Sequence, residues 1–451
     1  MKPSFLFINL SGDFLGIQQR IQDEGYDCYA WYSKDSIKGK GCAGKGLVTI
    51  VPDHYDVIKD FSDKKNELVI MVDDNAHGNE MDHLRSVGYH VIGSSEFSDT
   101  AEHERELGNA LAKLLGLNLP PTFEFKDFAS GLKFLDTQLP EQRFVFKANG
   151  VDLAGSSKTY VSKNLEDAKW FVAWVEKDQD VHAYTVDSFI LQEVIEGVEV
   201  DFACWFDGEN FAPAIGITFE QKKVKGLGAA QGCMGQIFFY IDANSTPAKA
   251  YFDRLAPILR RNKTGPNEWA INTIVAYEDE LPYFLEFTPR FGWDSTFGEL
   301  ALLEDAGKSI AEFFIRIAFS KKFPKDYFPL NKYSAAVRLF SESGGTKGDE
   351  VNGKPMFIAP YLLPNFWWYS VRIRDGDRLE ITDNPFGVAT SVANTPEMAA
   401  LEVYGLIDVH SYDFTVPDLW YSDTIGEEVT NSLKSLMRFG IIPEDIDLLT
   451  R

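Results

Sequence analysis

Three polar residues at alternate positions, Glu286, Thr288 and Arg290, stand in the stretch LEFTPRFGWDST. In a β-strand, alternate side chains share a face, so these three would lie on one face and Leu285 and Phe287 on the other. The apolar face would cover a core. The polar face would line a cleft, where a carboxylate can hold a metal ion and an arginine can hold phosphate oxygens. The alternative is a structural salt bridge between Glu286 and Arg290 at a sheet edge.

The same stretch belongs to a predicted hairpin that would add another oxygen donor. EWAINTIVAYEDELPYFLEFTPR predicts two antiparallel strands, and a turn centred on Asp279 places Asn272 directly across from Glu286. Asn272, Glu286 and Thr288 would then present oxygen ligands of the kind that magnesium prefers. A register shift of one residue would undo this pairing.

The elements that must position these residues fall into different patterns along the chain. The first part alternates helices with the apolar strands SFLFINL, YDCYAWY, LVTIV, ELVIMVDD and YHVIGSS, which predicts a βαβ layer with a mostly parallel sheet. One helix is expected across DTAEHERELGNALAKLLGL, and Pro120 and Pro121 begin a linker. Hairpin patterns follow, including the Asp207-Gly208 turn, and they favour antiparallel sheets. We therefore predict a mixed α/β and α+β fold with units at residues 1–118, 119–330 and 331–451.

The second unit carries residues suited to nucleotide binding. Lys147 ends the predicted strand RFVFK, and the loop ANGVDLAGSSK follows with little side-chain bulk. Small residues let backbone N–H groups approach phosphate oxygens, and a neighbouring lysine adds a point charge. In LQEVIEGVEVDF the backbone at Glu193 and Val194 would meet an adenine edge, while Glu199 would accept from ribose hydroxyls. The predicted ATP-binding residues are Lys147, Gly150, Gly155, Ser156, Ser157, Glu193, Val194 and Glu199.

Composition and charge exclude several classes of protein. A net charge of −24 argues against nucleic acid as a principal partner, because phosphate backbones are bound by basic surfaces. No apolar run approaches the roughly 20 residues of a membrane span, and the first run is too short for a signal peptide, so we expect a cytoplasmic protein. The segment GKGCAGKG lacks the Ser or Thr of a phosphate-binding loop and is interpreted as a surface loop. The cysteines are expected to be buried, without zinc chemistry, and are Cys28, Cys42, Cys204 and Cys233.

The order of these segments resembles the ATP-grasp superfamily and, within it, the phosphoribosylamine glycine ligase family. FVFKANGVDLAGSSKTYV is similar to that family's strand, lysine and glycine loop, LQEVIEGVEV to its adenine hinge, and LEFTPRFGWDST to its E-F-N-x-R-F-G-D-P-E motif. SESGGTKG and LWYSDTIGEEV are similar to its S-G-G-Y-P-G and Y-R-x-D-I-G segments. The resemblance covers nearly the whole chain. It implies an ATP-grasp fold with an N-terminal βαβ pre-ATP-grasp domain and a C-terminal mixed α/β unit.

The resemblance also implies an activity, that of an ATP-dependent carboxylate-amine ligase. ATP would phosphorylate a carboxylate and an amine would displace the phosphate, as when glycine is joined to phosphoribosylamine in purine biosynthesis. The partners would be these small molecules, and the protein a monomer or small homo-oligomer. Arg290 would stabilise the acyl phosphate, and Lys222 or Lys223 would hold phosphates, unless these lysines form a solvated loop pair. The ligands of magnesium, or of manganese in its place, would be Glu286, Thr288 and Asn272.

Several positions depart from that family. Thr288 replaces an asparagine that helps to hold magnesium, and WDS replaces D-P-E. Asn109 stands where an ATP-contacting lysine is usual, FEQKKVKGLGAAQGCMG follows the segment for the amino acid only loosely, and the opening G-G-R-E-H phosphate site is absent. Two alternatives therefore stand beside the first reading. One is a module that binds nucleotide without ligase turnover, and the other is a ligase for a different amino acid and amine.

Overall fold

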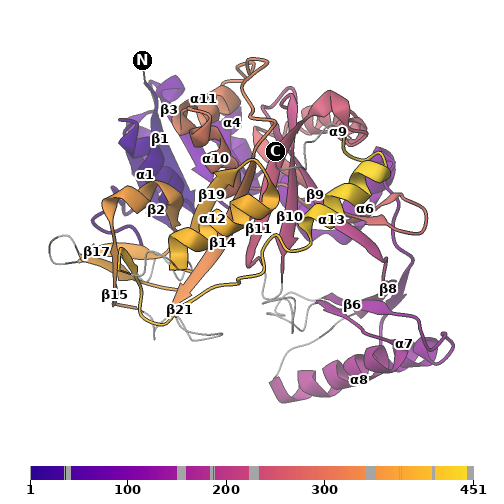
Figure 1. Cartoon of the computed structure of the whole chain (residues 1–451). Coiled ribbons are helices and arrows are strands. Elements are labelled where there is room, and N and C mark those ends of the chain that lie inside the picture. The colour runs from indigo at the N-terminus through magenta and orange to yellow at the C-terminus, as the bar shows by residue number, and fades with distance from the viewer. Residues whose placement is uncertain are drawn as a thin grey trace.

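The computed structural model describes residues 2–34, 36, 42–149, 159–182, 186, 188–222, 233–341, 352–374, 376, 378–408 and 412–443, without the side chains of Asn149, Trp293 and residues 179–182. Within these ranges the chain forms a parallel sheet near the N-terminus, a small antiparallel sheet in a projecting lobe, a long central antiparallel sheet and a small antiparallel sheet near the C-terminus (Figure 1). The sheets share one large apolar core, while the lobe and the outer face of the parallel sheet have cores of their own.

The N-terminal sheet has the strand order β2-β1-β3-β4, and its strand pairs are parallel, as predicted. Because the sheet is covered on both faces, β3 is apolar throughout and β1 is apolar between Ser4 and Asn9. Phe5 and Phe7 point into the large core, whereas Leu6 and Ile8 point into the outer cluster. The strands are β1 (Ser4–Asn9), β2 (Cys28–Tyr32), β3 (Leu68–Val72) and β4 (His90–Ile92). The helices are α1 (Leu15–Asp23), α3 (His54–Asp60), the short η1 (Lys65–Glu67), α4 (Gly78–Ser86), α5 (Glu96–His103) and α6 (Arg105–Leu115).

Three expectations for this part of the chain are wrong. LVTIV forms only an isolated bridge between Ala30 and Ile50 and another at Val48, because the segment lies at the surface with Ile50 40% exposed. The helix expected across DTAEHERELGNALAKLLGL is broken at Glu104, whose backbone is extended at φ −100° and ψ 102°, so α5 and α6 are separate helices. Cys42 is exposed, with a positive φ of 61°, whereas the other cysteines are buried.

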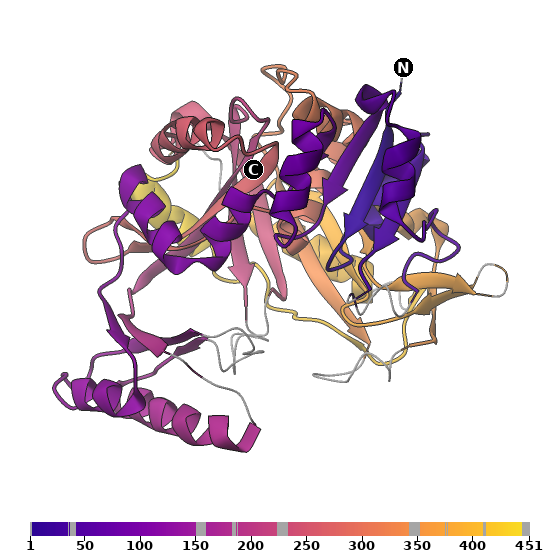
Figure 2. The same cartoon turned by 180° about the vertical axis from the view of Figure 1, so that it is seen from behind.

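The lobe consists of a small sheet in the order β5-β8-β6-β7, with antiparallel pairs, and two helices that cover one face. Phe146 points toward those helices and contacts Phe171. Because side chains alternate along a strand, the next residue, Lys147, points to the uncovered face. Figures 1 and 2 show the lobe projecting from the rest of the molecule. Its elements are β5 (Thr122–Phe125), α7 (Phe128–Leu135), β6 (Phe144–Asn149), β7 (Thr159–Val161), α8 (Leu165–His182) and β8 (Ser188–Glu193).

The long sheet has the order β13-β12-β9-β10-β11-β14-β19-β16, and β21 pairs with β14. The long sheet continues across residue 330, where the second predicted unit ends, because β11 before that residue pairs with β14 after it. Helices α5 and α6 pack on β13, and Figure 2 shows N-terminal helices crossing the back of the long sheet. The strands are β9 (Gly197–Phe206), β10 (Ala214–Gln221), β11 (Gly235–Asp242), β12 (Asn267–Ala276), β13 (Pro282–Thr288), β14 (Tyr333–Ser341), β16 (Phe366–Trp368), β19 (Gly387–Ala393) and β21 (Leu419–Trp420).

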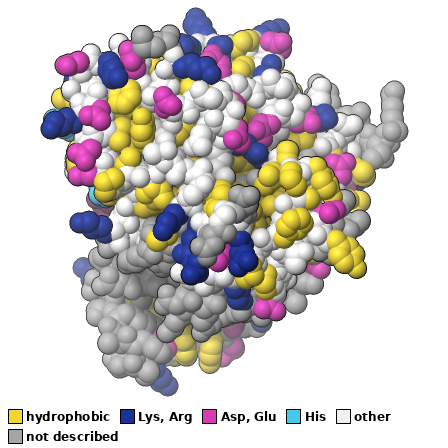
Figure 3. Space-filling view, turned by 90° about the vertical axis from the view of Figure 1, so that its left-hand side faces the viewer, with side chains coloured by type: hydrophobic (Ala, Val, Ile, Leu, Met, Phe, Trp, Pro, Cys, Tyr) yellow, Lys and Arg dark blue, Asp and Glu magenta, His cyan; other side chains and the backbone are white. Residues whose placement is uncertain are grey.

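The remaining elements cover the long sheet and complete the C-terminal part. The last sheet has the order β17-β18-β15-β20. None of the described helices is long and apolar enough to cross a membrane. The face seen in Figure 3 carries acidic and basic side chains interspersed among apolar ones. The helices are η3 (Ala243–Ser245), α9 (Lys249–Arg261), α10 (Trp293–Asp305), α11 (Ile310–Ala318), η5 (Pro360–Asn365), α12 (Pro396–Asp408) and α13 (Val429–Arg438). The strands of the last sheet are β15 (Lys354–Ile358), β17 (Val371–Arg374), β18 (Arg378–Ile381) and β20 (Phe414–Thr415).

Candidate functional site

The hairpin of β12 and β13 brings the predicted pair together. Asn272 lies opposite Glu286, which confirms the register predicted at this point. A β-bulge follows, so that Thr273 pairs with Phe284 and Leu285 has no partner in the ladder. The pairs nearest the turn are therefore shifted by one residue from those of a symmetric hairpin centred on Asp279, and the bulge compensates for that shift before Asn272 and Glu286.

The bulge also changes which side chains share a face. Phe284 is 3% exposed and Phe287 is 1% exposed, while Leu285 between them is only half-buried. The expectation that Leu285 and Phe287 together form the apolar face is wrong, because an extra residue in a strand interrupts the alternation. Glu286 and Thr288 remain on the open side, where a ligand can reach them.

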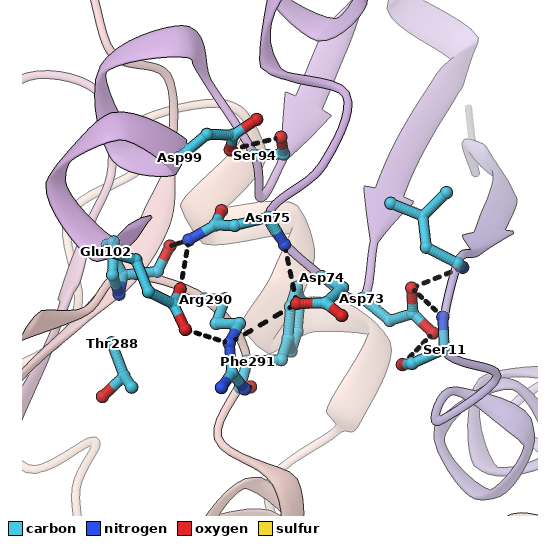
Figure 4. Close-up of polar contacts among 12 residues, drawn as sticks. Ser11, Asp73, Asp74, Asn75, Ser94, Asp99, Glu102, Thr288, Arg290 and Phe291 are labelled. Carbon is cyan, nitrogen blue, oxygen red and sulfur yellow. Dashed lines mark hydrogen bonds and ion pairs between the residues drawn. The ribbon is translucent and has the colours of Figure 1, made fainter. Parts of the chain in front are cut away.

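Arg290 lies beyond the end of β13 and is held by the N-terminal unit. Its Nε lies 2.9 Å from Glu102 Oε1 and 3.5 Å from Asp74 Oδ1 (Figure 4). Burial opposes the charge on the guanidinium, but Glu102 and Asp74 outweigh it and raise the pKa of Arg290 above its ordinary value. The prediction that Arg290 continues the strand face of Glu286 is wrong, because β13 ends at Thr288. Within the described ranges Glu286 makes no ion pair, so the alternative of an edge salt bridge is also wrong.

Lys147 and Glu286 interact across the space between the lobe and the long sheet. The Lys147 side chain is half-buried and forms no hydrogen bond or ion pair with any residue that the structure describes. Burial lowers the pKa of Lys147, and among the acids Glu286 opposes that shift most strongly. Arg105, at the start of α6, is near enough for its charge to lower the pKa of Lys147 further. Cationic side chains from two units therefore converge on the exposed carboxylate of Glu286.

Lys222 follows β10 and belongs to the same group of charges. Its Nζ lies 2.6 Å from Glu199 Oε1 and 3.6 Å from Glu220 Oε2. Burial disfavours the charge, but these two acids outweigh it, with Asp201 and Glu286 adding to them, and the pKa of Lys222 lies well above its ordinary value. Lys222 is therefore anchored by acids rather than part of a solvated loop pair. The predicted residues Lys223, Gly150, Gly155, Ser156 and Ser157 lie outside the described residues.

The hinge predicted to meet adenine follows the end of β8. The Glu193 N–H donates to Pro121 O at 2.9 Å, and the Val194 N–H donates to Arg143 O at 3.1 Å. Both backbone donors are thus used within the protein. Adenine contact at Glu193 and Val194 stays a prediction, as does the contact of Glu199 with ribose, since Glu199 already binds Lys222.

The predicted metal ligands sit in a row across adjacent strands. Asp201 and Glu286 flank Asn272 in the ladder. The Asn272 amide is best oriented with its nitrogen 2.5 Å from Asp201 Oδ1 and its oxygen accepting from Thr288 Oγ1 at 2.9 Å. Burial raises the pKa of Asp201 well above its ordinary value, although Lys222 opposes the shift.

The fit of these oxygens to magnesium depends on the nucleotide. Among the described residues, no group of three or more His, Cys, Asp or Glu side chains could hold a metal ion by itself. Magnesium in nucleotide sites is commonly held by one or two carboxylates together with substrate phosphates and water. Glu286, exposed and unpaired among the described residues, suits that role, with Asp201 as the second carboxylate. The oxygen donors therefore fit a magnesium ion that arrives with a nucleotide.

Asp201, Arg105 and Glu220 join the site without having been predicted from the sequence. Alternation along β9 could have found Asp201, because Glu199 and Asp201 are two residues apart on one strand. Arg105 gave no such signal, since its position depends on the break between α5 and α6. It lies one helical turn before Asn109, where the sequence had suggested a missing cation.

A cavity with a different lining lies elsewhere in the described part of the chain. It has a volume of about 690 Å³ and is lined by residues of α10, β19 and α12, among them Glu304, Thr390 and Glu402. The charged group around Lys147 and Glu286 does not line this cavity. Its assignment as the candidate site rests on charge and position and not on concavity.

Solved structures match almost the whole chain, while no protein-family model and no curated protein sequence matches it. The phosphoribosylamine–glycine ligase of Thermotoga maritima has a TM-score of 0.67 and 16% identity, and the match covers 94% of this chain and 100% of that one. The biotin carboxylase domain of the Hydrogenobacter thermophilus 2-oxoglutarate carboxylase, solved with MgADP, ADP and bicarbonate, has a TM-score of 0.62 and 14% identity, over 98% and 96% of the two chains. The N5-carboxyaminoimidazole ribonucleotide synthetase of Thermotoga maritima has a TM-score of 0.54 and 16% identity, over 93% and 100%. At these identities the likeness is one of fold, and it confirms the predicted fold class.

Proposed function

From this ATP-grasp fold we propose that the chain is an ATP-dependent ligase that joins a carboxylate to an amine through an acyl phosphate. The observation that carries the proposal is Lys147, a half-buried cation with no ion-pair partner among the described residues, opposite the exposed Glu286. A desolvated, unpaired ammonium group favours a bound anion, because an anion offsets the cost of burial. The phosphates of a nucleotide between the two sheets would supply that charge.

Each charged residue has a role in the proposed reaction. Lys147 and Lys222 would hold the phosphates of ATP, and Arg105 would add positive charge from α6. Arg290, fixed by Glu102, would meet the acyl phosphate. Magnesium bound with ATP at Glu286 would neutralise phosphate charge. Catalysis of this kind depends mainly on position and charge, and these side chains stand on strands, just beyond strand ends and at the start of a helix.

The proposed chemistry has two steps. An oxygen of the substrate carboxylate attacks the γ-phosphorus of ATP, and the bond to the β,γ-bridging oxygen breaks to release ADP. The amine nitrogen then attacks the carbonyl carbon, the C–O bond to phosphate breaks, and the nitrogen loses a proton to give the amide. We propose a small amino acid as the carboxylate substrate, with glycine first, and the cytoplasm as the place of action.

A second candidate function is a module that binds nucleotide without turnover. The observation that favours it is the Asn272 amide, whose two ends are engaged by Asp201 and Thr288. An amide used in this way has one lone pair of its oxygen occupied by Thr288, so it offers a metal ion fewer contacts than an unengaged amide. The number of ligands for magnesium would then be smaller than a ligase requires, while the lysines would still hold phosphates.

Nucleotide binding is tested by calorimetric titration of ATP, with and without magnesium, into the parent protein and Lys147→Met. We expect the variant to bind ATP about 10-fold to 100-fold more weakly, which corresponds to the loss of one or two charge-assisted hydrogen bonds. Lys133→Met is the matched control, because Lys133 is exposed on α7 of the same lobe. Equal ATP affinity in all three proteins would contradict the proposed site.

Ligase turnover is tested separately, by screening amino acids and amines for release of ADP. ADP release that requires both a carboxylate and an amine supports the ligase. Tight ATP binding without ADP release, whichever pair of amino acid and amine is supplied, supports the nucleotide-binding module. ADP release with a larger acid but not with glycine supports a ligase for a different amino acid.

A further inference from the structure

The loop that follows β1 directs a set of hydrogen-bond donors at a single carboxylate. Asp73 Oδ1 accepts from Leu10 N at 2.7 Å, and Asp73 Oδ2 accepts from Gly12 N at 2.7 Å and from Asp13 N at 3.0 Å. The Ser11 N–H adds a longer contact to Asp73 Oδ1 at 3.4 Å, and the Ser11 hydroxyl oxygen lies 3.0 Å from Asp73 Oδ2. Asp73 is 2% exposed and follows directly after β3 (Figure 4). Every N–H from residue 10 to residue 13 is thus bonded to this one side chain.

The position of this loop is one where parallel sheets bind anions. It lies at the carboxyl end of β1, just before α1, and beside β3, from which the chain leaves in the other direction along the sheet. Backbone N–H groups before a helix form an anion-binding concavity, and crevices at such a reversal of strand order bind ligands. In this chain the concavity is already filled by a carboxylate of the same chain.

The surroundings of Asp73 add further negative charge. Asp13 receives the Ser11 hydroxyl at 2.5 Å, and Asp74 is the next residue along the chain. Burial and the charge of Asp13 raise the pKa of Asp73, while the backbone N–H groups of Asp13 and Leu10 favour its ionised form. A phosphate group brought to this crevice would meet these carboxylates and no free backbone donor.

The crevice adjoins the reacting end of the candidate site. Asp74 lies 3.5 Å from Arg290, which is also bound by Glu102. Besides Glu102 and Asp74, Asp13 of the loop at residues 10–13 is near enough for its charge to raise the pKa of Arg290, so a substrate held at Arg290 would lie near this loop. At this position the carboxylate of Asp73 can repel a substrate that carries a negatively charged group.

We propose that Asp73 is a specificity-determining residue, which fills the anion position with the chain's own carboxylate and so selects an amine substrate without a phosphate group. The assignment of an amine substrate rests on the proposed ligase function. The closure of the anion position by Asp73 does not depend on turnover. It excludes phosphoribosylamine and other phosphorylated amines as the amine substrate, and it assigns the amine to the class of non-phosphorylated amines.

The closure of the anion position is tested with inorganic phosphate as the probe. Melting temperatures of the parent, Asp73→Ala and Asp73→Ser are measured against phosphate, with sodium chloride at equal ionic strength as the reference. We expect no specific effect on the parent and a rise of about 2 °C or more in both variants at a tenfold excess over Kd. If the variants do not fold in phosphate-free buffer, phosphate should restore their folding.

Asp99→Ala is the matched control for the loss of a buried carboxylate. Asp99 accepts from Gly78 N and from Ser94 Oγ, each at 2.8 Å, and its removal opens a position with only one backbone donor. We expect no phosphate effect on this variant. A specific phosphate effect on the parent, or none on the two Asp73 variants and no restored folding, would overturn the inference.

The choice of substrate is tested by ADP release with pairs of amines that differ only in a phosphate group, such as ethanolamine and O-phosphoethanolamine. We expect release only with the non-phosphorylated member of a pair, and release with a phosphorylated member in the parent would overturn the inference. If no amine supports ADP release, the ligase proposal fails. The phosphate titration still decides whether Asp73 closes the anion position, so the two failures are distinguishable.

Discussion

Arg290 Nε lies 2.9 Å from Glu102 Oε1, and this contact joins the loop after β13 to helix α5 of the N-terminal unit. Both side chains are 17% exposed. Glu102 is itself fixed, because its other oxygen accepts from Asn75 Nδ2 at 2.7 Å. The orientation of Arg290 at the candidate site is therefore set by a helix 188 residues away in the sequence.

Glu102→Gln should lower kcat by about tenfold or more and leave the Kd for ATP nearly unchanged. The variant keeps the shape of Glu102 but removes the charge that orients Arg290, which acts on the acyl phosphate and not on the nucleotide. Single-turnover kinetics and ATP titration separate the two effects. Glu106→Gln, on the exposed side of α6, is the control. Parent-like kcat in Glu102→Gln would show that Arg290 needs no partner from α5.

Glu286→Gln should reduce turnover on the order of a hundredfold or more, as expected when charge stabilisation at a phosphoryl group is lost. It should also weaken the effect of magnesium on ATP binding, because the exposed carboxylate would hold the ion. The measurements are ADP release and calorimetry at several magnesium concentrations. Glu278→Gln, in the exposed turn of the same hairpin, should behave like the parent. A fully active Glu286→Gln protein would rule out a role for Glu286 as a ligand.

Arg338→Met should destabilise the protein by about 3–5 kcal/mol, because it leaves a buried carboxylate without its partner. Arg338 donates to Asp294 Oδ1 at 3.0 and 3.1 Å, and the two side chains are 4% and 0% exposed. Urea unfolding measures the change. The double variant Arg338→Met/Asp294→Asn should lose less free energy of unfolding than the sum of the losses in the two single variants. By contrast, Lys249→Met removes an exposed pair with Asp253 and should cost about 0.5 kcal/mol or less.

Glu299→Gln should flatten part of the pH dependence of stability. Burial raises the pKa of Glu299 from 4.5 to about 7, although hydrogen bonds from Tyr240 and Trp205 oppose the shift. Glu268, whose pKa is also raised by burial, is the neighbouring acid in the same core. The folded state thus holds a proton that the unfolded state releases. Stability from this group is full below about pH 4.5 and is lost as pH rises to about 7.

The measurement is unfolding free energy of the parent and the variant at intervals from pH 4.5 to pH 8. The difference between the two proteins should change by an amount on the order of 3 kcal/mol over that range, with the parent losing more stability. Glu209→Gln, on an exposed turn, serves as the control. Parallel curves for parent and Glu299→Gln would mean that Glu299 does not hold the proton.

The sequence by itself determined the features that depend on near neighbours. The apolar runs SFLFINL and ELVIMVDD predicted strands of a covered parallel sheet, and β1 and β3 are those strands. The hairpin of β12 and β13 was also predictable from its turn residues, although Asn272 pairs with Glu286 only because the bulge at Leu285 compensates for the shifted turn. These patterns need only the period of a strand and the chemistry of a turn, both of which are encoded within a few residues.

Only the tertiary structure decided the features that depend on distant neighbours. The bulge at Leu285 set which side chains face the core, the break at Glu104 brought Arg105 toward the site, and the N-terminal helices supplied the partners of Arg290. Asp73 reaches donors 60 to 63 positions earlier in the chain. The physical reason is that desolvation and Coulomb energy depend on distances in space, and packing brings together charges that no local sequence pattern relates.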